Sequence, residues 1–202
     1  MTKCIIRNMP AKSVLTPHNT LAARSSVFSS HELSRALGSR TAIQRAVAAD
    51  KLVALGAGYY STLDLDPAVA QVVVVAKFYP KVVISGVSGL VIHRLSDEML
   101  QKVTVDTPKD RPVQNAIIQS RRVSKSRFIG VERRNYFGHS IRIYDIERLL
   151  CDAYRIDRGA LFFKALKRCL RDHKPNFQKI IRYDNVLGTK VLPAIQQELA
   201  DS

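Results

Sequence analysis

The most informative part of the chain is residues 29–60, which read Ser29-Ser-His-Glu-Leu-Ser-Arg-Ala-Leu-Gly-Ser-Arg-Thr-Ala-Ile-Gln-Arg-Ala-Val-Ala-Ala-Asp-Lys-Leu-Val-Ala-Leu-Gly-Ala-Gly-Tyr-Tyr60. Ser30 can cap a first helix, because its hydroxyl can accept hydrogen bonds from free backbone N–H groups of the first turn. Apolar side chains then recur at helical spacing, at Leu33, Ala36 and Leu37. Gly38 is expected to end this helix, since glycine tolerates the left-handed conformation. A second helix follows, capped by Ser39 or Thr41.

The second helix is predicted to have one apolar and one polar face. Its inward residues are Ala42, Ile43, Ala46 and Val47. Its opposite face carries Ser39, Arg40, Thr41, Gln44 and Arg45. These side-chain types pair with guanine, adenine and phosphate in protein–DNA complexes. We therefore expect this face to lie in the major groove, with Arg40 and Arg45 on guanine.

A hairpin is predicted after the second helix. Two short apolar runs flank Gly56-Ala57-Gly58, and glycine on both sides of a turn suits a hairpin. The order helix, glycine, helix, hairpin is the layout of a winged helix-turn-helix, which reads DNA with its second helix. As a wing, the hairpin sets Lys51 and Tyr59 near the phosphate backbone. Alternatively, these elements are only a packed piece of an α/β domain.

Size and charge are consistent with a nucleic-acid partner. The chain has 202 residues, enough for one large or two small domains, and its formal net charge is +15. Such an excess usually indicates a polyanionic partner. Any binding to nucleic acid should then weaken steeply with salt, because phosphate contacts release counterions. The alternative is a basic surface that serves only solubility.

The cysteines and apolar runs indicate a reducing compartment. Cys4, Cys151 and Cys169 form no Cys-x-x-Cys pair, so neither a disulfide framework nor a zinc site is predicted. Cys151 and Cys169 fall on apolar helix faces, where we expect them to act as small hydrophobic residues. We expect no signal peptide, no apolar run of the ~20 residues that a spanning helix needs, no membrane partner and a cytoplasmic location.

The remaining chain is expected to be mixed α and β. A first helix is predicted over part of residues 19–26, and a buried helix over Pro67 to about Phe78. That second helix has an explicit start signal, Asp66-Pro67, although Val72-Val-Val-Val75 has strand propensity. Strands are predicted at residues 82–84, 102–106, 116–120, 128–132 and 140–144, and helices from Ser85 or Val87 to Arg94, after Asp145, over Ala160–Arg171, after Pro175 and over Thr189–Leu199.

The fold class expected is therefore α+β. A winged helix-turn-helix domain with a flexible N-terminal arm would occupy residues 1–62. A second domain over residues 66–202 would hold a central, mostly antiparallel sheet and C-terminal helices.

The chain resembles a known family in the order of its segments. The small N-terminal unit is followed by Phe78-Tyr-Pro-Lys-Val-Val-Ile-Ser-Gly-Val-Ser-Gly-Leu-Val-Ile-His-Arg-Leu-Ser96, a β-rich middle and Ile143-Tyr-Asp-Ile-Glu-Arg-Leu-Leu-Cys-Asp152. Over about residues 28–152 it resembles the AbiEi-type antitoxins of bacterial type IV toxin–antitoxin systems.

The resemblance implies a cytoplasmic antitoxin that represses its own operon. Its N-terminal domain would bind double-stranded operator DNA with inverted repeats, occupied by two copies of a protein that is a monomer or weak oligomer in solution. Its C-terminal antitoxin domain would assist that binding. It would neutralise a nucleotidyltransferase-like toxin without forming a stable complex.

A second set of basic residues is a candidate extension of the DNA footprint. It comprises Arg121, Arg122, Lys125, Arg127, Arg133, Arg134, Lys164, Lys167, Arg168 and Arg171. The alternative is that these residues form a solvated cationic face that contacts no DNA.

No catalytic residue, metal site or cofactor is predicted. His93 is expected to be a capping or packed residue, and the five histidines have no metal-ligand spacing. We therefore do not expect an enzyme. Two alternatives stay open: a winged-helix regulator whose C-terminal domain senses a small ligand, and a DNA nuclease. A nuclease would need an acidic-x-Lys pair on adjacent strands, and the predicted strands do not supply one.

Overall fold

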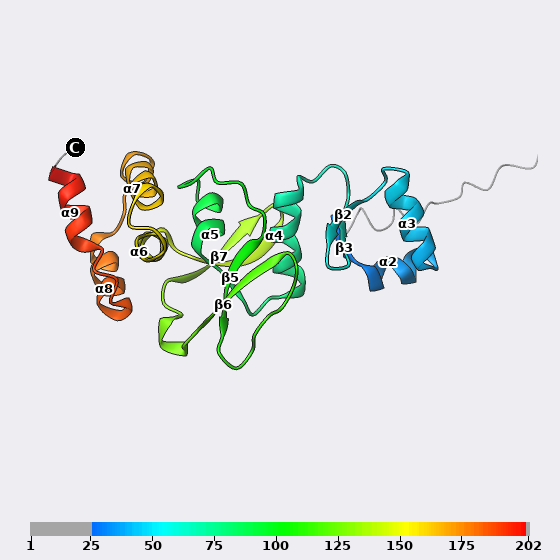
Figure 1. The fold of residues 1–202 in the computed structure, drawn as a ribbon, viewed down its shortest axis with the longest axis horizontal. Coiled ribbons are helices and arrows are strands. Elements are labelled where there is room, and N and C mark those ends of the chain that lie inside the picture. The colour runs from blue at the N-terminus through cyan, green and yellow to red at the C-terminus, as the bar shows by residue number, and fades with distance from the viewer. Residues whose placement is uncertain (1–25, 201–202) are drawn as a thin grey trace, which may run out of the picture.

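The computed structural model describes residues 26–200, which form a mixed α+β protein with two sheets and eight α-helices in that range (Figure 1). The N-terminal sheet has the order β1-β3-β2 and is antiparallel. Its strands are β1 (Val27–Ser29), β2 (Val53–Gly56) and β3 (Tyr59–Ser61), with α2 (Ser30–Leu37) and α3 (Arg40–Ala48) between β1 and β2. The helix predicted within residues 19–26 lies outside the described residues apart from Ser26.

The α2–α3 pair forms where the sequence predicts it, with one correction. The N-cap of α2 is Ser29 and not Ser30: Ser29 Oγ accepts from the Glu32 N–H at 3.2 Å, and Glu32 Oε2 accepts from the Ser29 N–H at 2.8 Å. This reciprocal capping box requires an acidic residue three positions after the cap, which only Ser29 has. Gly38 ends α2 with a left-handed φ of 82°. Ser39 then caps α3 by accepting from the Ala42 N–H at 3.1 Å.

Strand β1 was not predicted, because three residues are too few to show an alternating pattern. Phe28 pairs with Tyr60 of β3 in the antiparallel register. Successive side chains of a strand point to opposite faces. Phe28 accordingly packs with Leu33 and Ile43 under the helix pair, whereas Val27 packs on the other side against the valines of α4.

Helix α4 (Pro67–Phe78) lies between the two sheets (Figure 1). Asp66 Oδ1 caps it by accepting from the Ala68 and Val69 N–H groups. All four residues of the Val72–Val75 run are buried, because the helix packs on the N-terminal sheet on one side and on β5 and β8 of the larger sheet on the other. The explicit start signal thus correctly predicts a helix, and burial on both sides explains its strand-like valines.

The larger sheet corrects the predicted topology. Its strand order is β6-β5-β4-β8-β7. The pairs β4–β5 and β7–β8 are antiparallel, but β4–β8 and β5–β6 are parallel, so the sheet is mixed and not mostly antiparallel. Strand direction depends on how the connections cross the sheet, which strand composition does not encode. The strands are β4 (Val83–Ile84), β5 (Val103–Pro108), β6 (Ile118–Val123), β7 (Val131–Tyr136) and β8 (His139–Tyr144).

Strand β7 begins later than the predicted range of 128–132. A short 3-10 turn, η1 (Lys125–Arg127), precedes it, and Gly130 has a left-handed φ of 73° that breaks the extended chain. A Cβ at residue 130 would also lie 2.9 Å from Arg148 Cβ. The strand therefore starts only at Val131.

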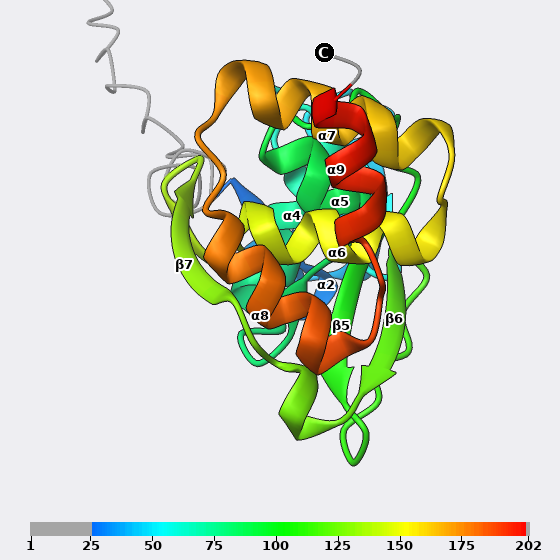
Figure 2. The same ribbon diagram turned by 90° about the vertical axis from the view of Figure 1, so that its left-hand side faces the viewer.

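Five helices complete the described fold. Helix α5 (Gly86–Ile92) packs closely on α6 (Ile146–Ile156), because Gly89 has no Cβ to collide with Leu149. Helices α7 (Ala160–Asp172), α8 (Phe177–Leu187) and α9 (Leu192–Ala200) follow, and Figure 2 shows α6–α9 in front of the larger sheet, at the end away from α2 and α3. Cys151 and Cys169 are buried apolar residues of this core, as predicted. Between residues 26 and 200 no helix is both long and apolar enough to cross a bilayer.

Candidate nucleic-acid interface

The predicted polar face of α3 is open to solvent. Ser39, Arg40, Thr41, Gln44 and Arg45 are all exposed, whereas Ile43 on the opposite side is buried. Among residues 26–200, no carboxylate lies within ion-pair distance of Arg40 or Arg45. Two guanidinium groups on one exposed helix face can each make the bidentate contacts that recognise guanine or phosphate.

The two predicted phosphate contacts are placed differently. Lys51 is exposed in the turn between α3 and β2. Tyr59 instead faces α4: its ring lies 5.0 Å from that of Phe78, and its hydroxyl is 3.0 Å from that of Tyr79. Burial and this hydrogen bond raise the pKa of the Tyr59 hydroxyl above its ordinary value of 10.0. Strand alternation points Tyr59 away from the helix pair, so it does not belong to the candidate interface.

The second basic set does not form one surface. Arg121 and Arg122 lie on β6, and Arg133 and Arg134 lie on β7. These strands are the two opposite edges of the larger sheet. At the usual strand spacing they are about 19 Å apart. Neighbours in the sequence are therefore not neighbours in space, and the basic residues of β6 and β7 lie at separate edges of the sheet.

Several cations of the second set are paired with carboxylates. Lys164 and Arg168 both contact Asp97, and these hydrogen bonds lower the pKa of the Asp97 carboxyl to about 2. Lys167 Nζ lies 3.3 Å from Glu198 Oε1, and Arg171 Nε lies 2.7 Å from Asp172 Oδ1. Within the described residues, the members that are exposed and make no ion pair are Arg122, Lys125, Arg127, Arg133 and Arg134. Arg134 donates a hydrogen bond to His93 instead.

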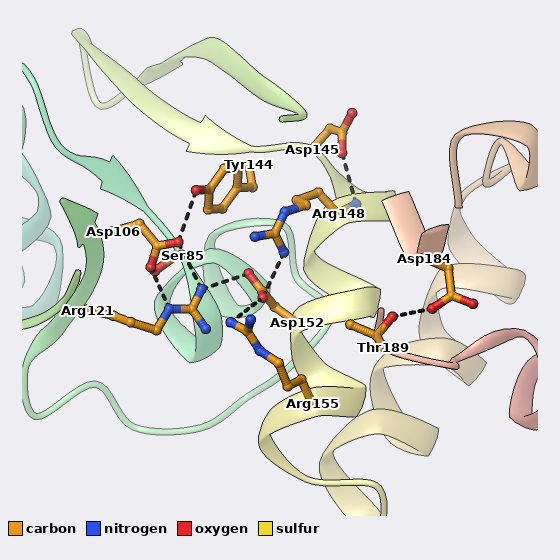
Figure 3. A network of polar contacts seen from close by, with 10 residues as sticks. All are labelled: Ser85, Asp106, Arg121, Tyr144, Asp145, Arg148, Asp152, Arg155, Asp184 and Thr189. Atoms are coloured by element: carbon orange, nitrogen blue, oxygen red, sulfur yellow. Dashed lines mark hydrogen bonds and ion pairs between the residues drawn. The ribbon is translucent and has the colours of Figure 1, made fainter. Parts of the chain in front are cut away.

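Arg121 belongs to a buried ionic network and not to a basic surface (Figure 3). Its Nε and Nη2 donate to the two oxygens of Asp106 at 2.8 and 2.9 Å, and Nη2 also donates to Asp152 at 3.1 Å. Asp106 further accepts from the hydroxyls of Ser85 and Tyr144, both at 3.0 Å. The network ties β5, β6 and β8 to helix α6.

Asp152 is the centre of this network, and sequence reasoning missed its role. It contacts Arg121, Arg155 at 3.1 Å and Arg148 at 2.7 Å. Arg148 has no exposed surface, and its guanidinium lies 4.5 Å from the centre of the Tyr144 ring. The contact with Asp152 is close but lacks hydrogen-bond geometry. The Arg148 guanidinium is therefore held by charge attraction to Asp152 and by stacking on the Tyr144 ring. The i,i+4 spacing of Arg148 and Asp152 is the signal that could have revealed the pair.

His93 is packed, as the sequence predicts, and is held in its neutral form. Its Nε2 donates to the Tyr144 carbonyl oxygen at 3.0 Å, and its Nδ1 accepts from Arg134 Nη1 at 2.9 Å. A guanidinium can only donate and a carbonyl can only accept, which assigns the proton to Nε2. Burial, together with the charge of Arg134, lowers the pKa of His93 from 6.5 to about 4.

The folded protein should lose stability as the pH falls from about 6.5 to about 4. In that window the unfolded chain binds a proton at residue 93 that the folded protein does not, because the folded pKa is about 4 and the ordinary value is 6.5. The free energy of unfolding should fall by about 3 kcal/mol across this window. Urea unfolding at several pH values, for the wild type and for His93→Gln, measures it.

The matched control for this prediction is His139→Gln, at a half-exposed position on β8. The His93 variant should lose most of the wild-type pH dependence between pH 6.5 and 4, and the His139 variant should retain it. An equal pH dependence in the His93 variant and the wild type would contradict the assignment.

No protein-family model and no curated protein matches this chain.

Proposed function

We propose that this protein binds double-stranded DNA with the outer face of α3, in the manner of a winged helix-turn-helix. The observation that carries the proposal is the exposed pair Arg40 and Arg45, with Thr41 and Gln44 between them and no carboxylate neighbour among the described residues. The element order supports it, since α2, Gly38 and α3 precede the β2–β3 hairpin. The net charge of +15 supplies the attraction to a polyanion.

In this proposal each side chain of the face has a distinct role. Arg40 and Arg45 contact guanine, and Gln44 contacts adenine, because the bidentate geometry of these pairs matches. Ser39 and Thr41 lie at the N-terminus of α3, whose free N–H groups favour a phosphate. Lys51 lies beside the phosphate backbone of the DNA. The five exposed and unpaired cations of the second set lie at two opposite edges of the larger sheet, so they do not form one continuous extension of the α3 face.

The biological role we propose is that of a type IV antitoxin that represses its own operon. This part rests on the resemblance of residues 28–152 to the AbiEi-type family. Two copies would occupy an inverted repeat upstream of the gene. Neutralisation is tested by inducing the neighbouring gene, expected to encode a nucleotidyltransferase-like toxin, with and without this protein. Growth arrest that co-expression fails to relieve would contradict the role.

DNA binding is tested by fluorescence anisotropy with a labelled duplex from the region upstream of the gene and a scrambled duplex of equal length. Because a protein of this charge binds any duplex, the ratio of the two affinities is the quantity to measure. We expect a preference of ~10³-fold or more. The affinity should fall steeply with salt for both duplexes. Equal affinities at every salt concentration would overturn the proposal.

A second candidate function is a winged-helix regulator that responds to a small ligand. It is favoured by a specific observation, an apolar groove at the C-terminal end of α4 whose walls touch the N-terminal sheet. The two candidates share the α3 interface and differ in what acts on the C-terminal part of the chain.

A further inference from the structure

The groove beside α4 has the size and lining of a ligand site. It encloses about 750 Å³ between the end of α4, the β5–β6 connection and the segment around η1. Small-molecule sites usually measure about 300–1,000 Å³ and are mainly apolar. Its walls are formed largely by apolar side chains, namely Phe78, Val82, Val113, Val123 and Phe128. An apolar surface of this extent in a concave site is suited to an apolar ligand body.

The groove is bordered by cations. Lys81, Lys109, Arg111 and Lys125 line it, against one carboxylate, Asp110. The Asp110 carboxylate is itself paired, since its Oδ2 lies 3.8 Å from Arg111 Nε. In residues 26–200, none of the three lysines has a carboxylate within ion-pair distance. The apolar walls therefore carry an excess of positive charge at their border, which favours a ligand with an anionic group.

We propose that this groove binds a small amphipathic anion, an aliphatic or aromatic carboxylate whose apolar body fills the groove and whose charged group meets the bordering lysines. The apolar lining disfavours a nucleotide or a sugar phosphate, because their polar atoms would lose water without gaining partners. The lysines disfavour a cationic amphiphile.

The groove is in direct contact with the N-terminal sheet. Phe78 and Tyr79 line it, and both also pack on Tyr59 of β3. The Tyr79 hydroxyl accepts from Asn115 Nδ2 at 2.8 Å and pairs with the Tyr59 hydroxyl. A ligand that shifts these rings changes how the N-terminal sheet, which carries α2 and α3, packs on α4. Its binding is therefore coupled to DNA binding, if α3 binds DNA as proposed above, and the coupling is reciprocal.

Binding is tested with the fluorescent sulfonate 1-anilinonaphthalene-8-sulfonate, displaced by decanoate or by decyltrimethylammonium. The first variant, Lys81→Glu/Lys125→Glu, reverses two bordering charges. The control, Lys102→Glu/Lys174→Glu, makes the same change at two exposed lysines outside the groove. We expect decanoate but not the cation to displace the probe, and the first variant to bind decanoate about tenfold more weakly than the control.

A second variant tests whether the ligand occupies the groove itself. The chain has no tryptophan, so Val113→Trp introduces a single tryptophan whose emission can be followed, and it also fills the groove. We expect blue-shifted emission and loss of decanoate binding, with an unchanged far-UV spectrum. Displacement by anion and cation alike, equal binding by the two double variants, or full binding by Val113→Trp would overturn the site. Binding of an acidic peptide without binding of decanoate would overturn the ligand class.

The coupling has its own measurement. Decanoate should change the affinity for the upstream duplex in the wild type. Tyr59→Phe removes the hydrogen bond to Tyr79 at a residue outside the groove lining, so this variant should still bind decanoate but lose the effect. An identical affinity with and without saturating decanoate would overturn the coupling. Because the fluorescence titrations need no DNA, failure of the groove and failure of the DNA-binding proposal give different results.

Discussion

Replacing Arg45 with alanine should reduce the preference for the upstream duplex by about 5- to 150-fold while leaving the fold intact. Arg45 is exposed on α3 and makes no ion pair within the described residues, so its removal leaves no buried group unsatisfied. Alanine is also the better helix former. A lost bidentate contact with guanine costs about 1–3 kcal/mol, and a double variant with Arg40→Ala should lose about twice as much. Fluorescence anisotropy with the upstream and scrambled duplexes measures the change.

The control for Arg45 is Arg182→Ala, which removes an equal charge from the exposed face of α8. It should weaken binding to both duplexes only slightly and leave their ratio unchanged. If Arg45→Ala and Arg182→Ala retained the same preference for the upstream duplex, α3 would not be the recognition element.

Replacing Asp152 with asparagine should destabilise the protein by about 3–5 kcal/mol, the usual cost of removing one partner of a buried ion pair. Asp152 and Arg148 both have 0% exposed surface. The variant keeps the shape of the side chain but leaves the Arg148 guanidinium without its only carboxylate contact in the described residues. The free energy of unfolding in urea measures the loss.

Asp97→Asn is the matched control, because Asp97 also contacts two cations, Lys164 and Arg168, but lies on the surface. Its loss should be much smaller, since water screens exposed pairs. The double variant Arg148→Met/Asp152→Asn should recover part of the stability that Asp152→Asn loses, because it removes the uncompensated charge. Equal losses for Asp152→Asn and Asp97→Asn would show that the network is not a stability determinant.

Local signals in the sequence predicted the helices well. The α2–Gly38–α3 unit, the start of α4 at Asp66-Pro67 and the cap of α6 at Asp145 all depend on contacts within four residues. The exposed face of α3 follows from the same helical period. The N-cap of α2 lies one residue earlier than predicted, because the reciprocal bond with Glu32 is open to Ser29 and not to Ser30.

Caps, turns and periodicity are short-range properties, so the amino-acid order alone specifies the local elements and the polar face of α3. The neighbours of each strand depend on three-dimensional packing. Packing therefore sets the parallel β5–β6 pair, the separation of Arg121 from Arg133 and the orientation of Tyr59 toward α4. It also decided that Arg121 neutralises Asp106 and Asp152 instead of facing solvent. These outcomes depend on contacts between residues far apart in the chain, whose pairing no local pattern specifies.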